Sequence, residues 1–337
     1  MTPLLEVRNI SVQFSGGRRA APLMAVDDVS LAVSPRETVG LVGESGSGKS
    51  TLGRVILGLV PATSGTVLFG GADITHAGYR TRRALSAELQ VVFQDPYSSL
   101  NPTRTVGQTL AEPLRVHGRL GKNEVAERIA SILARVGLPA EAAHRYPSQF
   151  SGGQRQRIAI ARALMISPRL VICDEPVSAL DLSVQAQVLN LLRDLQDQFE
   201  LSYLFIAHDL AVVRHLSNRI VVLYRGRVME EGDAAAVHGS PAHPYTRALL
   251  DAAPVPDPEM QKSRRLHRLA AKIEPRTIQP QADACVFASR CPHATDICWS
   301  VRPQLEPTQH DRAVACHHWR ALSAVSPPPT LTKVPHT

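Results

Sequence analysis

Two hydrophobic patterns alternate along the first 253 residues of the chain. Short, almost wholly apolar runs of strand length occur at 38–43 (TVGLVG), 170–173 (LVIC) and 202–207 (SYLFIA). Each precedes a stretch with helical spacing. In the stretch 183–199 one helical face carries Val184, Val188, Leu191, Leu192, Leu195 and Phe199. Strands that are apolar on both faces and alternate with helices are typical of a parallel sheet covered by helices. The pattern therefore predicts an α/β fold.

Two further helices are predicted from local signals. The stretch 123–137, NEVAERIASILARVG, has helical spacing, with Asn123 as a suitable N-cap and Gly137 at its C-terminal end. A last helix is expected over 245–252, where it closes the main domain.

The pattern changes near residue 254. Downstream, prolines become frequent and the chain finishes in SPPPTLTKVPHT. This composition favours irregular structure and a flexible tail. We therefore divide the chain into a main domain over 4–253, a C-terminal extension over 254–320 and a tail over 321–337. Removal of the extension is expected to spare the chemistry of the main domain.

Composition and charge narrow the class of protein. The 337 residues are 44% hydrophobic, enough for a large core, and no window approaches eighteen consecutive apolar residues. The N-terminus lacks the charged start and apolar block of a signal peptide, so the cytosol is the expected compartment. The formal net charge is +7, but the arginines are scattered, which favours a solvated surface over a nucleic-acid face.

The sequence GESGSGKS, residues 43–50, matches the spacing G-x-x-x-x-G-K-S/T between an apolar strand and a helix. Glycines let the backbone N–H groups of such a loop turn toward phosphate oxygens, and the following helix adds its positive N-terminal end. Lys49 is expected to neutralise the β- and γ-phosphates of a nucleotide, and the Ser50 hydroxyl to ligate Mg²⁺. A plain Gly/Ser turn is the alternative reading, which the flanking strand and helix disfavour.

Two adjacent carboxylates, Asp174 and Glu175, end the apolar run LVICDE. Ligands of parallel sheets bind at the carboxyl ends of the strands. Beside a phosphate-binding loop, Asp174 is expected to hold Mg²⁺ and Glu175 to polarise the water that attacks the γ-phosphate. Away from such a loop, either would be a strand cap or an ion-pair partner. His208 follows the next apolar strand, so its imidazole is expected on the γ-phosphate side.

A second anion-binding turn occurs in QFSGGQRQRIAIARAL, residues 149–164, where Ser-Gly-Gly runs into a helix. One nucleotide does not need two such turns from one subunit, so this one is expected to serve the ATP of a neighbouring subunit. With GESGSGKS, FQDP, FSGGQ, LVICDE, SALD and AHD in this order, residues 4–253 resemble the ATP-binding subunits of ABC transporters.

The resemblance implies a P-loop ATPase cassette with a mostly parallel core sheet, an antiparallel N-terminal β region and a helical signature subdomain. It implies ATP contacts from Phe14, Gly43, Glu44, Ser45, Gly46, Ser47, Gly48, Lys49, Ser50 and Thr51. The resemblance assigns catalysis to Glu175, His208 and Gln94. It assigns magnesium binding to Ser50, Gln94 and Asp174. It assigns contact with the ATP bound by the opposite subunit to Ser151, Gly152, Gly153 and Gln154. The remaining assignment is Asp181, which links the two ATP sites.

A finer resemblance comes from FQDPYSSLNP, SPAHPYTRALL and the later CVFASRCP. These stretches look like those of the ATPases of oligopeptide and dipeptide importers, a group that also handles nickel and glutathione. The resemblance implies ATP-driven dimer closure at the cytoplasmic face of a bacterial or archaeal inner membrane. The implied partners are two permease subunits, a second, similar ATPase and, indirectly, an extracytoplasmic solute-binding protein. Peptides are the expected cargo, with nickel, glutathione or another small solute as alternatives.

A nucleic-acid-linked ABC ATPase is the rival from another class. Only about a hundred residues separate Ser50 from Ser151, too few for a long coiled-coil arm, and the chain carries one cassette. Its cysteines also lack the paired CxxC spacing of a zinc ribbon. No nucleic-acid partner is therefore expected.

Four of the five cysteines, Cys285, Cys291, Cys298 and Cys316, lie in the extension. Four thiolates are what an iron–sulfur cluster takes from a protein, and a small loop-rich segment needs a staple to fold. Their spacing resembles the C-terminal pattern of peptide-importer ATPases, some of which are associated with a four-iron, four-sulfur cluster. Zinc is the main alternative, followed by disulfides or free thiols.

Overall fold

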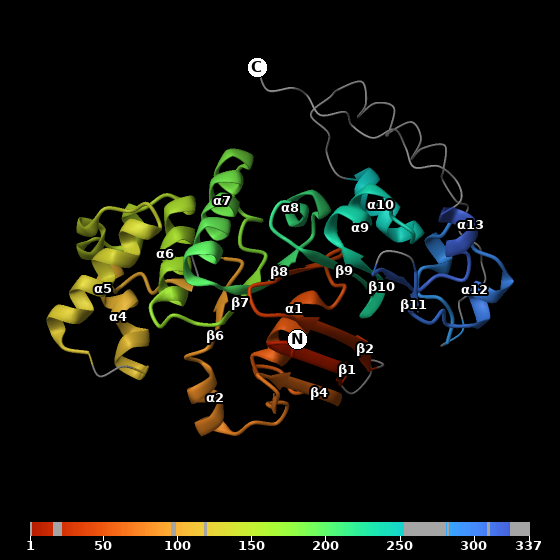
Figure 1. The fold of residues 1–337 in the computed structure, drawn as a ribbon, viewed down its shortest axis with the longest axis horizontal. Helices are drawn as coiled ribbons and strands as arrows, with labels where there is room; N and C mark the ends of the chain where they lie inside the picture. Colours follow the sequence, from red (N-terminus) through yellow and green to blue (C-terminus); the bar gives the residue numbers. More distant parts are fainter. Residues whose placement is uncertain are drawn as a thin grey trace, which may run out of the picture.

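The computed structural model describes residues 2–15, 22–95, 99–117, 120–252, 281, 283–308 and 311–323. These residues form two sheets and several groups of helices (Figure 1). The predicted boundary near 253 lies outside the described residues, as do residues 324–337 of the predicted tail, whereas residues 321–323 of that tail are helical.

The larger sheet has the strand order β11-β12-β10-β9-β3-β8-β7-β6. Its parallel part consists of β3 (Thr38–Val42), β6 (Leu89–Val92), β7 (Leu170–Asp174), β8 (Ser202–Ala207) and β9 (Arg219–Tyr224). Every residue of β3, β7 and β8 is buried, so the prediction of apolar strands covered on both faces is confirmed. The parallel strands all end at the same edge, where the candidate site lies.

The smaller sheet is antiparallel, in the order β2-β1-β4-β5, from β1 (Leu5–Phe14), β2 (Leu23–Val33), β4 (Ser64–Phe69) and β5 (Ala72–Asp73). Helix α1 (Lys49–Ile56) lies between the two sheets (Figure 1). Leu52, Val55 and Ile56 of this helix are buried in a core cluster to which strands of both sheets contribute. The expected antiparallel N-terminal region and mostly parallel core sheet are both present.

Helices cover the other face of the large sheet. One end of the molecule holds α4 (Val106–His117), α5 (Lys122–Arg135) and α6 (Gly152–Leu164) (Figure 1). Helices α7 (Leu182–Phe199), α8 (Leu210–Arg214), α9 (Ala234–Gly239) and α10 (Pro244–Ala252) follow across the sheet. Shorter elements are α2 (Tyr79–Leu85) and the 3₁₀ turns η1 (Ala140–His144) and η2 (Pro147–Gln149). Val188, Leu191, Leu192 and Leu195 of α7 are buried, as their spacing predicts.

The predicted start of α5 was wrong. Asn123 lies inside the helix, and Gly121 is the N-cap. The reason is the Glu124 carboxylate, which accepts a hydrogen bond from the Gly121 amide at 2.7 Å and so fixes the first turn two residues earlier. The C-terminal end agrees with the prediction, because Gly137 follows the helix with a φ of 71°.

The described part of the extension is joined to the large sheet. It contains η3 (Ala288–Arg290), α12 (Asp296–Ser300), β11 (Glu306–Pro307), β12 (Ala313–Val314) and α13 (Trp319–Ser323). Strand β12 pairs antiparallel with β10 (Arg227–Asp233), where Glu230 is opposite Val314. Phe287, Cys298 and Trp299 are buried in the same core cluster as α7 and β8. The extension thus continues the sheet of the main domain.

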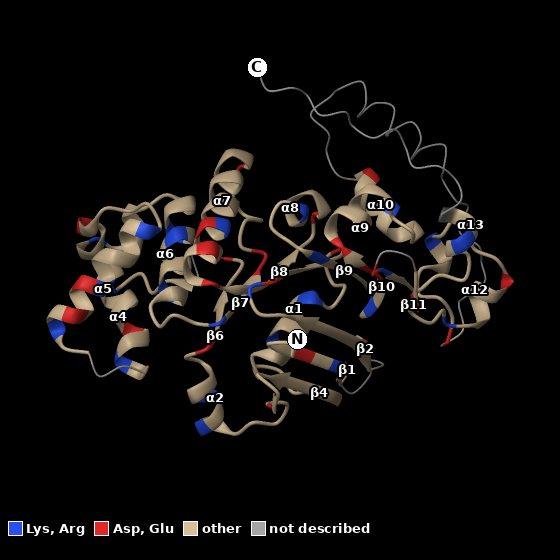
Figure 2. Cartoon of the chain, viewed as in Figure 1, with Lys and Arg blue, Asp and Glu red and all other residues tan. Residues whose placement is uncertain are grey.

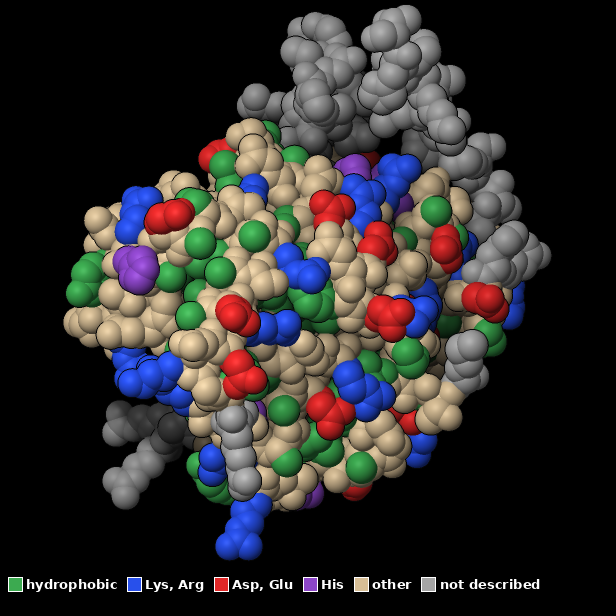
Figure 3. Space-filling model, turned by 60° about the vertical axis from the view of Figure 1, so that its left-hand side comes forward, with side chains coloured by type: hydrophobic (Ala, Val, Ile, Leu, Met, Phe, Trp, Pro, Cys, Tyr) green, Lys and Arg blue, Asp and Glu red, His purple; other side chains and the backbone are tan. Residues whose placement is uncertain are grey.

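Charges of both signs are dispersed over the elements (Figure 2). On the face shown in Figure 3, basic and acidic side chains are intermingled. This distribution agrees with the expectation of a mixed, solvated surface. Across the described residues, no helix combines the length and hydrophobicity needed to cross a bilayer.

Candidate active site

The loop between β3 and α1 holds the predicted phosphate-binding residues. Gly43 lies so close to β9 that a Cβ there would be 2.0 Å from the carbonyl oxygen of Leu223. Gly48 has a φ of 103°, and its Cβ would lie 2.3 Å from the carbonyl oxygen of Ala25. Both positions therefore require glycine, and the loop is wedged between strands of the two sheets.

Lys49 is buried at the centre of this loop. Its ammonium donates to the carbonyl oxygens of Gly43 at 2.7 Å and Glu44 at 2.9 Å. Burial lowers the pKa of Lys49, and the nearby carboxylates of Glu175 and Asp174 oppose that shift. A buried cation whose partners are mostly loop carbonyls is well suited to bind a phosphate oxygen.

The adjacent carboxylates at the end of β7 point to different partners. Asp174 accepts a hydrogen bond from the hydroxyl of Ser50 at 2.8 Å. This pair gives two oxygen ligands beside the ammonium of Lys49, the kind of oxygen donor set that suits Mg²⁺. The observed donors therefore fit the expected magnesium site.

Glu175 is the centre of a second group of contacts. Its carboxylate accepts from the side-chain amide of Gln94 at 3.1 Å, lies 3.6 Å from Nδ1 of His208 and lies 4.0 Å from Nζ of Lys49. Its backbone φ is 47°, in the left-handed region that few non-glycine residues adopt. The structure thus brings the three residues assigned to catalysis together at the strand ends.

Phe14 is exposed at the end of β1 and pairs with Leu23 in the small sheet. The backbone of Ala25, two positions further along β2, lies close to Gly48 of the phosphate-binding loop. Of the other loop residues, Ser45 and Gly46 are exposed, Ser47 is buried, and Thr51 belongs to the first turn of α1.

The signature residues form the start of α6. Ser151 caps the helix, with its hydroxyl accepting from the Gln154 amide at 3.4 Å and its own amide donating to the Gln154 side chain at 3.1 Å. Gly153 packs against α7, because a Cβ there would lie 2.4 Å from Val184. In the portion of the chain that is described, no hydrogen bond or ion pair joins Ser151, Gly152 or Gln154 to Lys49 or Glu175.

Asp181 caps α7. Its carboxylate accepts from the Val184 amide at 3.0 Å and from the Ser183 hydroxyl at 2.7 Å, and these hydrogen bonds lower its pKa. It lies in the connection between β7 and α7, six residues after Glu175.

Comparison with known proteins identifies the family. A family profile described as "ABC transporter" matches residues 26–178, and one described as "Oligopeptide/dipeptide transporter, C-terminal region" matches residues 229–298. The chain is 48% identical to the oligopeptide transport ATP-binding protein OppF of Escherichia coli over 90% of this chain and 92% of that protein. It is 45% identical to the putative oligopeptide transport ATP-binding protein YkfD of Bacillus subtilis, over 94% and 96% of the two chains. The chain belongs to the oligopeptide-transporter branch of the ABC ATPases.

Solved structures agree with this assignment. The dimeric ATP-binding cassette MJ0796, in a post-hydrolysis state bound to ADP and Pi, resembles this chain with a TM-score of 0.62 and 29% identity, covering 68% of this chain and 98% of that one. The similarity confirms the ABC cassette fold and the ATPase class predicted from the motifs.

Two residues that contact the phosphate-binding loop of this ABC ATPase were not predicted. The Tyr245 hydroxyl accepts a hydrogen bond from the Glu44 amide at 2.9 Å, and Arg290 of the extension donates to both carboxylate oxygens of Glu44 at 2.8 and 2.9 Å. The hydrogen bonds from Arg290 lower the pKa of Glu44. The sequence signals only the stretches that contain these residues, SPAHPYTRALL and CVFASRCP.

The four cysteines of the extension converge in the structure. The Cys285 amide donates to the Cys298 carbonyl at 3.0 Å, and His318 lies 3.6 Å from Sγ of Cys298. Burial raises the pKa of the Cys291 thiol to about 12 and that of the Cys316 thiol to about 11, and the nearby thiols of Cys285 and Cys298 raise both values further. All four are free thiols. Within the described ranges, however, no three His, Cys, Asp or Glu side chains are arranged to hold a metal ion.

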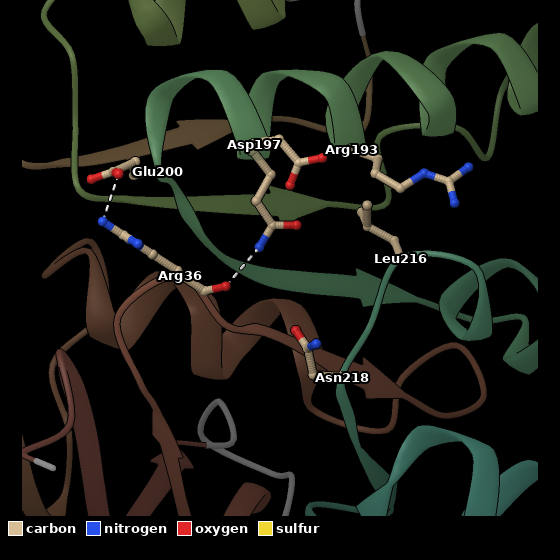
Figure 4. Close-up of a pocket in the computed structure, with 7 residues that line it drawn as sticks. Arg36, Arg193, Asp197, Glu200, Leu216 and Asn218 are labelled. Carbon is tan, nitrogen blue, oxygen red and sulfur yellow. Dashed lines mark hydrogen bonds and ion pairs between the residues drawn. The ribbon is translucent and has the colours of Figure 1, made fainter.

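A pocket lies at the opposite edge of the large sheet (Figure 4). Arg36 and Glu200 form an ion pair at its rim, and Asn218 accepts from the Thr38 amide at 2.8 Å. Thr38 begins β3, whereas the phosphate-binding loop follows the end of that strand. This pocket is therefore not part of the nucleotide site.

Proposed function

We propose that this chain is the ATP-hydrolysing subunit of an ABC importer of peptides. The observation that carries the proposal is the cluster of Lys49, Ser50, Asp174 and Glu175 around one glycine-dependent loop. Relatives of 45–48% identity over nearly the whole chain bear the names of oligopeptide transport proteins. The proposed assembly contains two permease subunits and a second, similar ATPase at the cytoplasmic face of the membrane, served by an extracytoplasmic solute-binding protein.

In this proposal each residue of the nucleotide site has a separate role. The backbone amides of the loop and Lys49 bind the phosphates, and Phe14 stacks on the adenine. Ser50 and Asp174, with Gln94, would hold Mg²⁺, which would neutralise charge on the phosphates. Glu175 accepts the proton of the attacking water, and Gln94 and His208 fix the orientation of its carboxylate.

Hydrolysis is proposed to require a closed dimer. Ser151 and Gly153 sit at the start of α6, separate from the loop of their own chain, and expose a helix N-terminus that suits a phosphate. Binding of this turn to ATP held by a second ATPase would complete both sites, with Asp181 between them. The dimeric form of the MJ0796 cassette supports this arrangement.

The test of the ATPase assignment uses two variants of the assembled transporter. Glu175→Gln should retain Mg-ATP binding and reduce ATP turnover by roughly a hundredfold or more, because the proton acceptor is lost while the loop is intact. Lys49→Ala should lose most of its ATP affinity. Wild-type turnover in Glu175→Gln would show that another group is the base.

A separate experiment tests the division of labour between subunits. Isolated Ser151→Ala chain should bind ATP as the wild type does, since its own loop is unchanged, yet turnover at the partner's site should fall in the assembled transporter. Weakened ATP binding by the isolated variant would contradict the shared-site arrangement. Uptake of labelled peptides by vesicles containing the complete transporter then tests the cargo.

We also propose that Cys285, Cys291, Cys298 and Cys316 hold an iron–sulfur cluster of structural or redox-sensing role. The convergence of four free thiols supports it, and four thiolates match such a cluster. Because the observed arrangement does not suit a metal ion, the thiols would have to reorient on binding. Anaerobically purified chain should be brown and contain roughly four irons. Colourless protein with one zinc would identify the competing four-thiolate site.

A further inference from the structure

The C-terminal extension makes direct contact with the phosphate-binding loop through Arg290. Its guanidinium donates to Oε2 and Oε1 of Glu44 at 2.8 and 2.9 Å, a bidentate pair between positions 246 residues apart. Arg290 belongs to η3, between Cys285 and Cys291, whereas Glu44 is the second residue of the loop that follows β3. This is a specific contact between the last part of the described chain and the nucleotide site.

Aromatic side chains hold Arg290 in place. The guanidinium lies 5.6 Å from the ring centre of Tyr224 and 5.8 Å from that of Phe287, and donates to the Tyr224 hydroxyl at 3.4 Å. The Phe287 and Tyr245 rings pack on Tyr224, at 5.3 and 4.6 Å. These rings come from the extension, α10 and the end of β9, so three separate segments fix one arginine.

Glu44 is held at both its side chain and its backbone. Arg290 binds the carboxylate, the Tyr245 hydroxyl accepts from its amide at 2.9 Å, and Lys49 donates to its carbonyl oxygen at 2.9 Å. These contacts therefore fix the backbone of the first turn of the loop, whose N–H groups would face a phosphate. An exposed ion pair alone contributes little, and here the side chains are 49% and 41% exposed. The bidentate geometry and the neighbouring aromatic rings fix the orientation of this pair more strictly than that of an ordinary exposed ion pair.

The charge of Glu44 makes the pairing important. A carboxylate in a loop that binds a polyanion repels the ligand, and an unpaired Glu44 would also attract the Lys49 ammonium that the phosphates need. Arg290 cancels this charge from outside the loop.

We propose that Arg290 is a positioning residue of the ATP site, which neutralises and orients Glu44 and thereby raises the affinity for ATP. The proposal rests on the assignment of the nucleotide site to this loop. It gives the extension a role in ATP binding, contrary to the expectation that its removal spares the main domain.

The experiment measures equilibrium binding of a fluorescent ATP analogue, with Mg²⁺, to the full-length isolated chain. Arg290→Gln should weaken binding roughly 3- to 10-fold, the range of an ordered charge pair. In the Glu44→Gln background the same Arg290→Gln change should have no further effect, because the carboxylate that it neutralises is gone. Arg290→Lys should restore part of the affinity, since it restores the charge but not the bidentate geometry.

Arg302→Gln is the matched control. This arginine also belongs to the extension and lies 3.6 Å from Asp27 and 3.7 Å from Asp28 of β2, away from Glu44. It should bind the analogue as the wild type does. Thermal unfolding without nucleotide, measured for every variant, separates an effect on binding from general destabilisation.

Wild-type affinity in Arg290→Gln would overturn the proposal, and so would an equal loss in the Glu44→Gln background, because that loss would reflect structural damage. Lys49→Ala separates the assignment of the nucleotide site from the role proposed for Arg290. If Lys49→Ala binds the analogue normally, the site assignment itself is wrong. If Lys49→Ala loses binding and Arg290→Gln does not, only the role of Arg290 is refuted.

Discussion

Gly46 and Gly48 are required in the phosphate-binding loop for different physical reasons. Both have a positive φ, 78° and 103°. A Cβ at Gly46 would meet no atom within 4 Å, whereas a Cβ at Gly48 would lie 2.3 Å from a backbone oxygen. Gly46 is thus needed for its dihedral angle alone, and Gly48 also for the close approach of β2.

This difference predicts unequal effects of the same substitution. Gly46→Ala should lower the free energy of unfolding by about 1 kcal/mol, the cost of a left-handed non-glycine residue. Gly48→Ala should lower it by about 3 kcal/mol, because the added methyl must also displace backbone. Urea unfolding of the nucleotide-free chain measures both, with Gly46→Ala as the matched control. Equal losses of unfolding free energy would show that the backbone of β2 moves at little cost to make room for the added methyl group.

Sequence predicts the placement of single residues best where the motif is local. The loop residues lie next to one another in the chain, so their spacing alone predicts how Lys49 and Ser50 are placed. Tyr245 and Arg290 act on Glu44 across 201 and 246 positions. Nothing in the spacing of residues specifies those contacts, because they depend on how α10 and the extension pack against β9.

At the scale of elements, the N-terminus of α10 is secured by a buried histidine. Nδ1 of His243 accepts from the Tyr245 amide at 2.9 Å, and its ring lies 5.8 Å from that of Phe287. Burial lowers the pKa of His243 to about 3. The folded chain therefore keeps this imidazole neutral at pH values where the unfolded chain protonates it.

This histidine predicts a loss of stability in mild acid. Between its unfolded pKa near 6.5 and its folded value of about 3, the unfolded state binds the extra proton, so stability falls as the pH falls. From pH 7 to pH 5 the contribution is about 2 kcal/mol. His243→Asn, which keeps an acceptor for the Tyr245 amide but does not titrate, should lose less stability over this interval. Parallel denaturant series at the two pH values test it, and identical pH dependence of the two chains would contradict it.

Elements were predictable where burial is periodic or continuous. The largely apolar runs of β3, β7 and β8 and the repeating face of α7 are buried as their patterns indicate. The start of α5 was misplaced because Gly121, without a side chain, serves as N-cap with help from Glu124. Strands β11 and β12 have two residues each, too few for any pattern to predict.

At the scale of the whole molecule, the extension completes the large sheet and covers one of its edges. Strand β12 pairs with β10, and Arg312 of the extension lies 3.9 Å from the buried carboxylate of Glu230. Phe287 and Trp299 fill the adjoining core. Without the extension, β10 would present an unpaired edge above an exposed apolar surface.

A chain truncated after residue 252 is therefore expected to be less stable than the full-length chain. It should unfold at a lower temperature and bind more of a hydrophobic dye, because the edge of β10 and the aromatic cluster around Tyr224 and Tyr245 are uncovered. Arg290→Gln, which leaves this surface covered, is the control and should match the wild type in both measurements. A truncated chain with unchanged melting temperature and dye binding would show that the extension is a separate unit.

The order of strands also determines when the nucleotide site can form during protein synthesis. Strand β3, which leads into the phosphate-binding loop, pairs with β8 and β9, and β8 begins 160 residues after β3 ends. A ribosome that adds 5–20 residues per second needs roughly 10 to 30 s for that distance. Throughout this time an almost wholly apolar strand has no sheet partner on either side. The loop that we propose to bind ATP is thus translated early in the cassette, and it acquires the sheet that supports it only late.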